Sequence, residues 1–340
     1  MKTIVAILNW NGIEHLKTYL PSVVEFSKIN IYVIDNGSTD DSVSWINVTY
    51  PEIEIIQLPQ NLGFAGGYNA GLSNISADRF ILLNSDVRVT EGWVESVNKS
   101  MNDNNWSACA PIILDDKNPE YYEYAGAAGG FIDKDGFMFC AGRVFDSIEK
   151  VNGHYKTDEE VFWASGAALF VDSKVWDEVE GLDSDLFAHM EEIDFCWRLK
   201  NRGYKIGACR NAYVYHYGGG TLTTSSPRKV FLNFRNNLVI ILKNQTGYPL
   251  LFIYRRLLLD GVAALRFLLR GELIFFLSVV KAHLAFYRMI PSTIKKRQLE
   301  LIARETNIAN RTGMYKKSIL IEYFLNKAKS ISDLSFNDFE

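Results

Sequence analysis

The stretch Phe80-Ile81-Leu82-Leu83-Asn84-Ser85-Asp86 decides the fold class, because a wholly apolar run ends abruptly at polar side chains. Such a run is typical of a buried strand in a parallel sheet, and open α/β sheets bind ligands beyond the carboxyl ends of their strands. An aspartate at this place can give an oxygen ligand to a divalent cation that holds a diphosphate. The alternative is that Asp86 caps a following helix, since Asp is a favoured residue at helix starts.

Three similar apolar runs precede this one, at residues 3–8, 31–34 and 53–58. Segments long enough for helices separate the runs, which predicts a Rossmann-like α/β fold with a mostly parallel sheet flanked by helices. Polar side chains follow each run, so we expect the strand ends to face one crevice. In chain order these side chains are Asn9 and Asn11, Asp35 and Asn36, Asn61, and then Asn84, Ser85 and Asp86.

Two loops at these strand ends have the composition of ligand-binding turns. Gly37 lets the chain turn sharply after Asp35, whose carboxylate can accept a hydrogen bond from a nucleobase or a ribose hydroxyl. The segment Gly63-Phe64-Ala65-Gly66-Gly67 leads into a predicted helix that carries Asn69, and it leaves backbone N–H groups open to a ligand. The sequence has neither a GxGxxG fingerprint nor a P-loop lysine here, so neither a dehydrogenase nor a phosphate-splitting nucleotidase is supported.

The middle of the chain supplies small side chains and a second group of acids. Residues 118–158 are predicted to form an elaborated connection with hairpins, and residues 161–171 a strand. Gly166 in that strand permits close approach by a sugar, although tight core packing explains it equally well. Glu191 and Glu192 then open an amphipathic helix, where one can act as a general base and the other can orient it. Favourable electrostatics at a helix start is the alternative explanation.

A histidine ends a short aromatic strand further along the chain, at Tyr213-Val214-Tyr215-His216. Gly218-Gly219-Gly220 follow it, and we expect this loop to close over a ligand. The neutral imidazole of His216 can complete the metal coordination that Asp86 begins, while a structural histidine is the alternative.

Composition sets limits on the class of protein. The 340 residues, 48% hydrophobic and 22% charged, suit one large domain with an appendage. The net charge of -4 does not indicate the basic surface that nucleic-acid binding requires. Four cysteines without CxxC spacing predict buried thiols and a reducing cytoplasm. The first apolar run is too short for a signal peptide, and no apolar run of about eighteen residues is uninterrupted, so we expect no spanning helix.

Five motifs occur in an order that is typical of one enzyme family. They are Ile7-Leu8-Asn9-Trp10-Asn11-Gly12, Val33-Ile34-Asp35-Asn36-Gly37-Ser38, Asn61-Leu62-Gly63-Phe64-Ala65-Gly66-Gly67, Leu83-Asn84-Ser85-Asp86, and the stretch from Glu191 to Arg198 with His216 beyond it. Each motif is modest alone. Together, over residues 1–245, the chain resembles the inverting family-2 glycosyltransferases, especially the rhamnosyltransferase-like branch of bacterial surface-polysaccharide synthesis.

The resemblance implies a GT-A fold, a donor site, a metal site and a base. Asp35 and the loops of Asn9 and Asn61 would hold the nucleoside, Asp86 would support Mg²⁺ or Mn²⁺ on the diphosphate, and Glu192 would be the general base. The predicted metal ligands are Asp86 and His216, and the predicted catalytic residues are Glu192 and Glu191. The predicted nucleotide-sugar-binding residues are Asn9, Asn11, Asp35, Asn36, Asn61, Gly63, Phe64, Asn69, Asn84, Ser85 and Gly166.

Two positions depart from the family pattern. Asn84 stands where the first acid of an Asp-x-Asp motif often occurs, which leaves fewer charged ligands and predicts a weaker or more hydrated metal site. Glu191-Glu192 replaces the usual Glu-Asp pair, so the choice of the acting glutamate stays open.

The expected reaction moves a sugar from a nucleoside-diphosphate donor to a hydroxyl of a growing, lipid-linked surface glycan, with inversion at the anomeric carbon. The resemblance favours dTDP-rhamnose as the donor, followed by UDP-hexoses. The alternatives are a nucleotidyltransferase that makes activated sugars, which has no need of the paired glutamates, and a non-catalytic nucleotide- or glycan-binding module. The sequence leaves the donor sugar and base, the acceptor and linkage, and the oligomeric state open.

A C-terminal helical region, residues 246–340, is predicted to follow the GT-A domain of residues 1–245. Residues 250–290 are markedly apolar, with basic residues whose spacing would place them in about one quadrant of a continuous helix. These basic residues are Arg255, Arg266, Arg270, Lys281 and Arg288. We predict an in-plane segment on the cytoplasmic, inner-leaflet face of the membrane that brings the site to a lipid-linked acceptor. A soluble helical subdomain or a homo-oligomer interface is the alternative.

Overall fold

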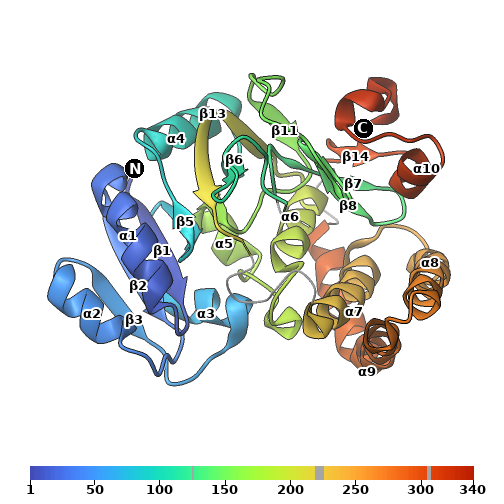
Figure 1. The fold of residues 1–340 in the computed structure, drawn as a ribbon, viewed down its shortest axis with the longest axis horizontal. Coiled ribbons are helices and arrows are strands. Elements are labelled where there is room, and N and C mark those ends of the chain that lie inside the picture. Colours follow the sequence, from blue (N-terminus) through green and yellow to red (C-terminus); the bar gives the residue numbers. More distant parts are fainter. Residues whose placement is uncertain (125, 219–225, 305–307) are drawn as a thin grey trace.

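The apolar runs at the start of the chain form the parallel half of a large sheet. In the computed structural model, which describes residues 1–124, 126–218, 226–304 and 308–340, they are β1 (Thr3–Asn9), β2 (Asn30–Asp35), β3 (Glu54–Gln57) and β4 (Arg79–Asn84). The pairs β4 and β1, β1 and β2, and β2 and β3 are parallel. All four strands therefore end at the same edge, which confirms the predicted α/β fold with a parallel-rich sheet (Figure 1).

The other half of this sheet mixes strand directions. β12 (Ala168–Asp172) runs antiparallel between β4 and β6 (Ala108–Asp115), and β13 (Ile206–His216) runs parallel to β6. β11 (Glu159–Val161) and β5 (Val87–Arg88) both pair antiparallel with β13. Within the described residues the sheet has nine strands, eight of them in the order β11-β13-β6-β12-β4-β1-β2-β3.

The predicted strand over residues 161–171 is wrong. Its two ends belong to β11 and β12, which have different neighbours in the sheet. Between them Ser165 turns the chain: its hydroxyl and its carbonyl accept hydrogen bonds from the backbone N–H groups of Ala167 and Ala168. Gly166 consequently lies in a turn beside the ends of the parallel strands, and not within a strand.

Alternating strand residues build a hydrophobic core on each face of the sheet. In β1, Ile4 and Ala6 belong to one core and Val5 and Ile7 to the other. One face is covered by α1 (Ile13–Ser27), α2 (Ser42–Thr49) and α4 (Trp93–Asn104). The other is covered by α3 (Gly63–Leu72), α5 (Ser173–Glu178), α6 (Glu191–Asn201) and α7 (Pro227–Asn244).

A second, smaller sheet lies beside the large one, and the predicted hairpins within residues 118–158 are confirmed there. Its antiparallel strands are β7 (Gly130–Asp133), β8 (Met138–Cys140), β9 (Arg143–Val144) and β10 (Ser147–Ile148). β14 (Met314–Tyr315) joins it parallel to β7. Three short helices follow: α10 (Ile319–Phe324), η2 (Ile331–Asp333) and η3 (Phe336–Asp338). The end of the chain thus packs back on the hairpins (Figure 1).

Two helices, not one, occupy the region of residues 250–290. α8 (Pro249–Leu269) and α9 (Leu273–Arg304) are separated at Gly271, whose φ of +76° lies in the left-handed region where glycine is favoured. Gly261, by contrast, lies inside α8. The basic residues of α8 and α9 therefore do not lie in one quadrant of a single helix.

Among the described residues, α9 is long and apolar enough to cross a membrane, by length and composition. Mean hydropathy tolerates the scattered polar residues that interrupt the apolar run, so this property neither confirms nor contradicts the expectation that no helix spans a membrane. One side of α9 packs against α7 and α8, yet only 22% of its apolar window is buried. Most of the apolar window of α9 is therefore not covered by its contacts with α7 and α8.

Candidate functional site

Asn9 and Asp35 lie side by side at the ends of β1 and β2. The Asn9 amide donates to Asp35 Oδ1 and to Ser38 Oγ, both over 3.3 Å. The Ser38 backbone N–H donates to Asp35 Oδ2 over 3.1 Å. Asn9 Oδ1 is buried and has no hydrogen-bond partner in the described part of the chain. The floor of the predicted crevice therefore offers an acceptor that a ligand can satisfy.

Asn36 and Asn61 hold the loop that begins α3. The Asn36 amide donates to Gly63 O over 3.0 Å and accepts from Leu62 N over 2.9 Å. Asn61 Oδ1 accepts from Gly63 N over 2.8 Å. Gly37 has a φ of +72°, and a Cβ there would come within 2.7 Å of the Gln60 backbone. These two asparagines therefore fix the backbone of the loop that leads into α3.

Asn11 and Asn69 both form hydrogen bonds within the protein. Asn11 Oδ1 accepts from Thr39 N over 2.7 Å. The Asn69 amide donates to Leu182 O over 2.7 Å and accepts from Leu182 N over 2.9 Å. Asn69 therefore ties α3 to the segment that precedes α6, which positions the loop and leaves less of the amide for a sugar.

Asn84 ends β4, Ser85 follows it, and the two residues link the two halves of the sheet. Asn84 is in register with Leu8, and its backbone N–H donates to Ala167 O over 3.0 Å. Ser85 Oγ lies 3.6 Å from the point where Gly12 would carry a Cβ. The end of β4 thus borders both the β1 loop and the turn that contains Gly166.

Asp86 lies between β4 and β5, and α4 begins only at Trp93. The helix-cap alternative is therefore wrong. Asp86 Oδ1 is 3.2 Å from His216 Nε2, because β5 pairs with the end of β13 and sets Val87 opposite His216. Glu123 Oε1 lies 3.5 Å from His216 Nδ1 on the other side of the ring. The imidazole is held between two carboxylates.

These neighbours set the charges of the pair. Burial opposes charge on Asp86, but His216 outweighs burial and lowers the pKa of that carboxyl below its ordinary value. Burial also opposes the imidazolium, yet Asp86 and Glu123 outweigh it and raise the pKa of His216 to about 10. Asp86 is consequently ionised throughout the neutral range.

Asp86, together with His216 once a cation displaces the proton from its ring, fits a divalent cation that is shared with an anionic ligand. Carboxylate oxygen and imidazole nitrogen are both ligands for Mn²⁺, and Mg²⁺ in nucleotide sites takes one or two carboxylates plus phosphate oxygens and waters. In the described ranges no group of three His, Cys, Asp or Glu residues could hold a metal ion. The remaining ligands would therefore come from a diphosphate and water.

Glu191 and Glu192 form the first turn of α6, as predicted. Glu191 is buried, whereas Glu192 is half-buried. A Cβ on Gly166 would lie 3.5 Å from Glu192 Cβ and 3.5 Å from the Phe64 ring. Gly166 therefore keeps open a space between the glutamate and the α3 loop.

The two glutamates differ in their affinity for a proton. Burial first, and then the charge of Glu192, raise the pKa of Glu191 well above its ordinary value. Burial raises the pKa of Glu192 to about 7. Glu191 Oε2 has no hydrogen-bond partner within the described residues. Of the two, Glu192 is the one that ionises near neutral pH, which makes it the better base.

Adjacent contacts join the predicted residues into one site. Asp35 contacts Asn9, the Asn84 amide lies 3.4 Å from His216 Nε2, and the Asn84 backbone reaches the turn of Gly166 beside Glu192. Asp86 and Glu192 thus border the same edge of the sheet. The glycine loop predicted to close over the ligand lies mostly outside the described residues, at 219–225.

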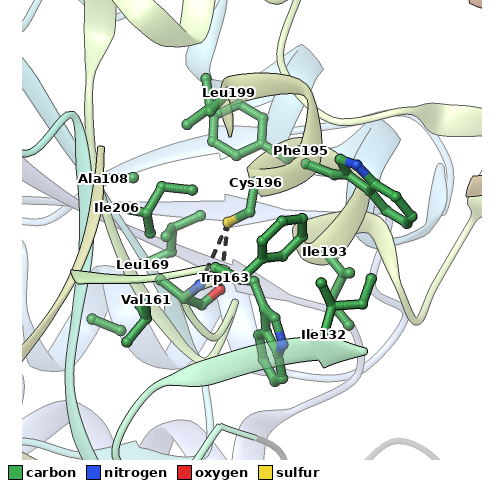
Figure 2. Close-up of a cluster of buried hydrophobic side chains, with 14 of the residues drawn as sticks. Ala108, Ile132, Val161, Trp163, Leu169, Ile193, Phe195, Cys196, Leu199 and Ile206 are labelled. Carbon is green, nitrogen blue, oxygen red and sulfur yellow. Dashed lines mark hydrogen bonds between the residues drawn. The ribbon is translucent and has the colours of Figure 1, made fainter. Parts of the chain in front are cut away.

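The base is positioned by contacts that sequence reasoning missed. Figure 2 shows α6 anchored in the core, where Cys196 contacts the backbone of Ala164. The Asn236 amide of α7 donates to the carbonyls of Leu186, Ala188 and His189, just before Glu191. No spacing signal links Asn236 or Glu123 to the site, because tertiary folding alone brings these distant segments together.

Comparisons with known proteins bear on the family of the chain. Residues 4–162 match the family model Glycosyl transferase family 2. The chain is 24% identical, over 69% of its length and 74% of the relative, to the low-salt glycan biosynthesis hexosyltransferase Agl10 of Haloferax volcanii. It is 23% identical, over 88% of its length and 97% of the relative, to an N-acetylglucosaminyl-diphospho-decaprenol L-rhamnosyltransferase of Mycobacterium tuberculosis.

A solved structure supports the fold. The mannosyltransferase of Pyrobaculum calidifontis, in complex with GDP-Man and Mn²⁺, superposes with a TM-score of 0.51 at 11% identity. The superposition covers 96% of this chain and 88% of that one. At this identity the superposition shows the fold alone, a GT-A fold, while the family model over residues 4–162 and the two relatives support a family-2 glycosyltransferase.

Proposed function

We propose that this glycosyltransferase is metal-dependent and inverting, and that it moves a hexosyl or rhamnosyl group from a nucleoside diphosphate to a lipid-linked glycan at the cytoplasmic face of a membrane. The observation that carries the proposal is the placement of an ionised Asp86 and a proton-accepting Glu192 at one sheet edge. The names of the relatives support a hexosyl or rhamnosyl donor, and the mycobacterial name supports an acceptor on a polyprenyl diphosphate.

The donor nucleoside would lie over the ends of β1 and β2. Asp35 accepts hydrogen bonds there from Asn9 and Ser38, and Asn9 Oδ1 is left to accept one from the ligand. Gly63 and Phe64 at the start of α3 would line the path from the nucleoside towards the sugar. Asp86 and His216 would hold Mg²⁺ or Mn²⁺ against the diphosphate; when bound, the cation neutralises charge that develops on the leaving group.

Glu192 would accept the proton of the acceptor hydroxyl. The acceptor oxygen forms a bond to the anomeric carbon as the bond from that carbon to the diphosphate oxygen breaks, so the configuration inverts. The proton passes to Glu192, and the electron pair of the broken bond leaves with the diphosphate. Glu191, whose pKa is raised further, stays protonated and does not compete for this role.

A transfer assay tests the proposal. The chain is incubated with Mn²⁺ or Mg²⁺, a polyprenyl-diphosphate N-acetylglucosamine acceptor, and a panel including dTDP-rhamnose and UDP-hexoses. We expect a product of inverted anomeric configuration, read by NMR, that disappears with a chelator. Retained configuration would refute the inverting mechanism. Formation of a nucleotide sugar from sugar phosphate and nucleoside triphosphate would instead indicate a nucleotidyltransferase, and donor binding without turnover would indicate a binding module.

A further inference from the structure

α8 and α9 each expose an apolar stripe on the side that faces away from the protein. Along α8 the exposed residues recur every three or four positions, at Leu251, Tyr254, Leu258, Val262, Leu265 and Leu269. Along α9 they are Leu273, Leu277, Val280, Leu284 and Tyr287, with the same spacing. The α8 stripe is about 27 Å long at 1.5 Å per residue, far more than scattered surface leucines produce.

The opposite sides of both helices pack against the rest of the protein. Ile253, Arg256, Asp260 and Ala264 of α8 are buried, with Arg256 Nε donating to Asp260 Oδ1 over 2.8 Å. On α9, Arg297 donates to Leu242 O over 3.0 Å and to Gln245 O over 2.6 Å at the end of α7. These contacts, with those of Lys296 to Asp183 and Asp185, fix α9 along the catalytic domain.

The charges beside the stripes are almost all basic. Between residues 249 and 299 the only acids are Asp260, which is buried against Arg256, and Glu272 in the turn between the helices. The exposed cations of this segment are Arg255, Arg266, Arg270, Lys281, Arg288 and Lys295. An apolar face with a basic border matches an anionic lipid surface, where apolar side chains enter the headgroup boundary and cations meet phosphates.

We infer that the α8 and α9 hairpin docks in the plane of an anionic membrane, with both stripes in the lipid and α9 not crossing it. A second copy of the chain is a poorer occupant, because a symmetric interface would set the same basic borders against each other. A spanning α9 would have to give up the contacts of Arg297 and Lys296 with the catalytic domain. The inference deepens the proposed function, since a lipid-linked acceptor lies at such a surface, but it is testable without any sugar transfer.

The test is flotation of the full chain with vesicles of phosphatidylcholine, with and without phosphatidylglycerol. We expect binding that requires the anionic lipid and weakens with salt. L258E/L265E should weaken binding by about tenfold or more, because each substitution removes an apolar side chain from the lipid and adds a repelled charge. R266E/K281E should lose about tenfold of the preference for anionic vesicles. Both positions of the first pair are exposed, so thermal unfolding should not change.

V48E is the matched control, because Val48 is an exposed apolar residue of α2, on the catalytic domain. It should bind vesicles like the unchanged chain. Binding of donor nucleotide with Mn²⁺ in solution should be equal in all variants, so failure of docking is distinguishable from failure of the proposed reaction. The inference is overturned if the unchanged chain ignores anionic vesicles, if V48E loses as much binding as L258E/L265E, or if bound protein resists alkaline carbonate as a spanning helix does. It is also overturned if the chain dimerises through this face in ultracentrifugation.

Discussion

Asp86 and Glu192 border the same edge of the sheet, but their surroundings act on their charges in opposite directions. Asp86 has a close cationic partner, because the imidazole of His216 is 3.2 Å away and lowers the pKa of the carboxyl. Glu192 is half-buried at the start of α6, where burial raises its pKa to about 7. Two carboxylates whose pKa values are pushed apart can take separate roles: a permanent charge that holds a cation, and a group that gains and loses a proton.

The largest effect is expected for Glu192→Gln, which preserves shape but removes the proton acceptor. Turnover should fall by about 10²- to 10⁴-fold, the usual contribution of a positioned base. Donor affinity, measured by calorimetry with Mn²⁺, should be unchanged. Glu191→Gln is the control, because Glu191 is already protonated in our assignment; a larger loss there would exchange the roles of the two residues.

The second prediction concerns Asp86, the carboxylate that stays ionised. Asp86→Ala should weaken metal-dependent donor binding by about 10²-fold, since the variant loses a carboxylate ligand worth several kcal/mol. Calorimetric titration with and without Mn²⁺ separates this effect from loss of nucleoside contacts. Equal donor affinity in the presence and absence of metal in the unchanged chain would contradict the metal role of Asp86.

The third prediction, Glu123→Gln, tests whether Glu123 supports the metal site through His216. The Glu123 carboxylate is 3.5 Å from His216 Nδ1, so it favours a ring whose Nε2 is directed at Asp86. We expect Mn²⁺ affinity, followed by the EPR signal of the free ion, to fall by about 10- to 100-fold. Nitrogen NMR should show His216 losing its proton at a lower pH than in the unchanged chain, because Glu123 raises the pKa of the ring. An unaltered titration of His216 with weakened affinity would mean that Glu123 acts through folding, and Glu120→Gln, at an exposed site, is the control.

The smallest effect is a pH dependence of the turnover number. Because burial raises the pKa of Glu192 to about 7, the base is protonated and inactive at low pH. At saturating metal and donor, turnover should rise through about pH 7 and be roughly tenfold below its plateau at one pH unit beneath that point. Asp86 contributes no step in this range, since its pKa is lowered. A flat profile from pH 5 to pH 9 would place the base elsewhere.

The sequence predicted which polar residues lie close together better than it predicted the elements that carry some of them. Asn9, Asp35 and Asp86 follow apolar runs whose carboxyl ends must share an edge once the strands are parallel, so their proximity was predictable. Gly166 was placed in a strand that does not exist, because a buried turn of small residues has the same apolar composition as a buried strand. Residues 250–290 do not share one helical wheel, because the chain turns at Gly271, whereas Gly261 lies inside α8.

The local pattern of the sequence by itself determined the parallel half of the sheet, the polar strand ends and the acidic start of α6, because alternation of apolar runs and turn residues acts over short distances. Only the tertiary structure decided which carboxylate keeps its charge. The pKa of Asp86 depends on β5 pairing with β13, and that of Glu192 on burial of α6 against the core. Glu123 joins the site for the same reason: charge interactions depend on distance in space, which the order of residues along the chain does not fix.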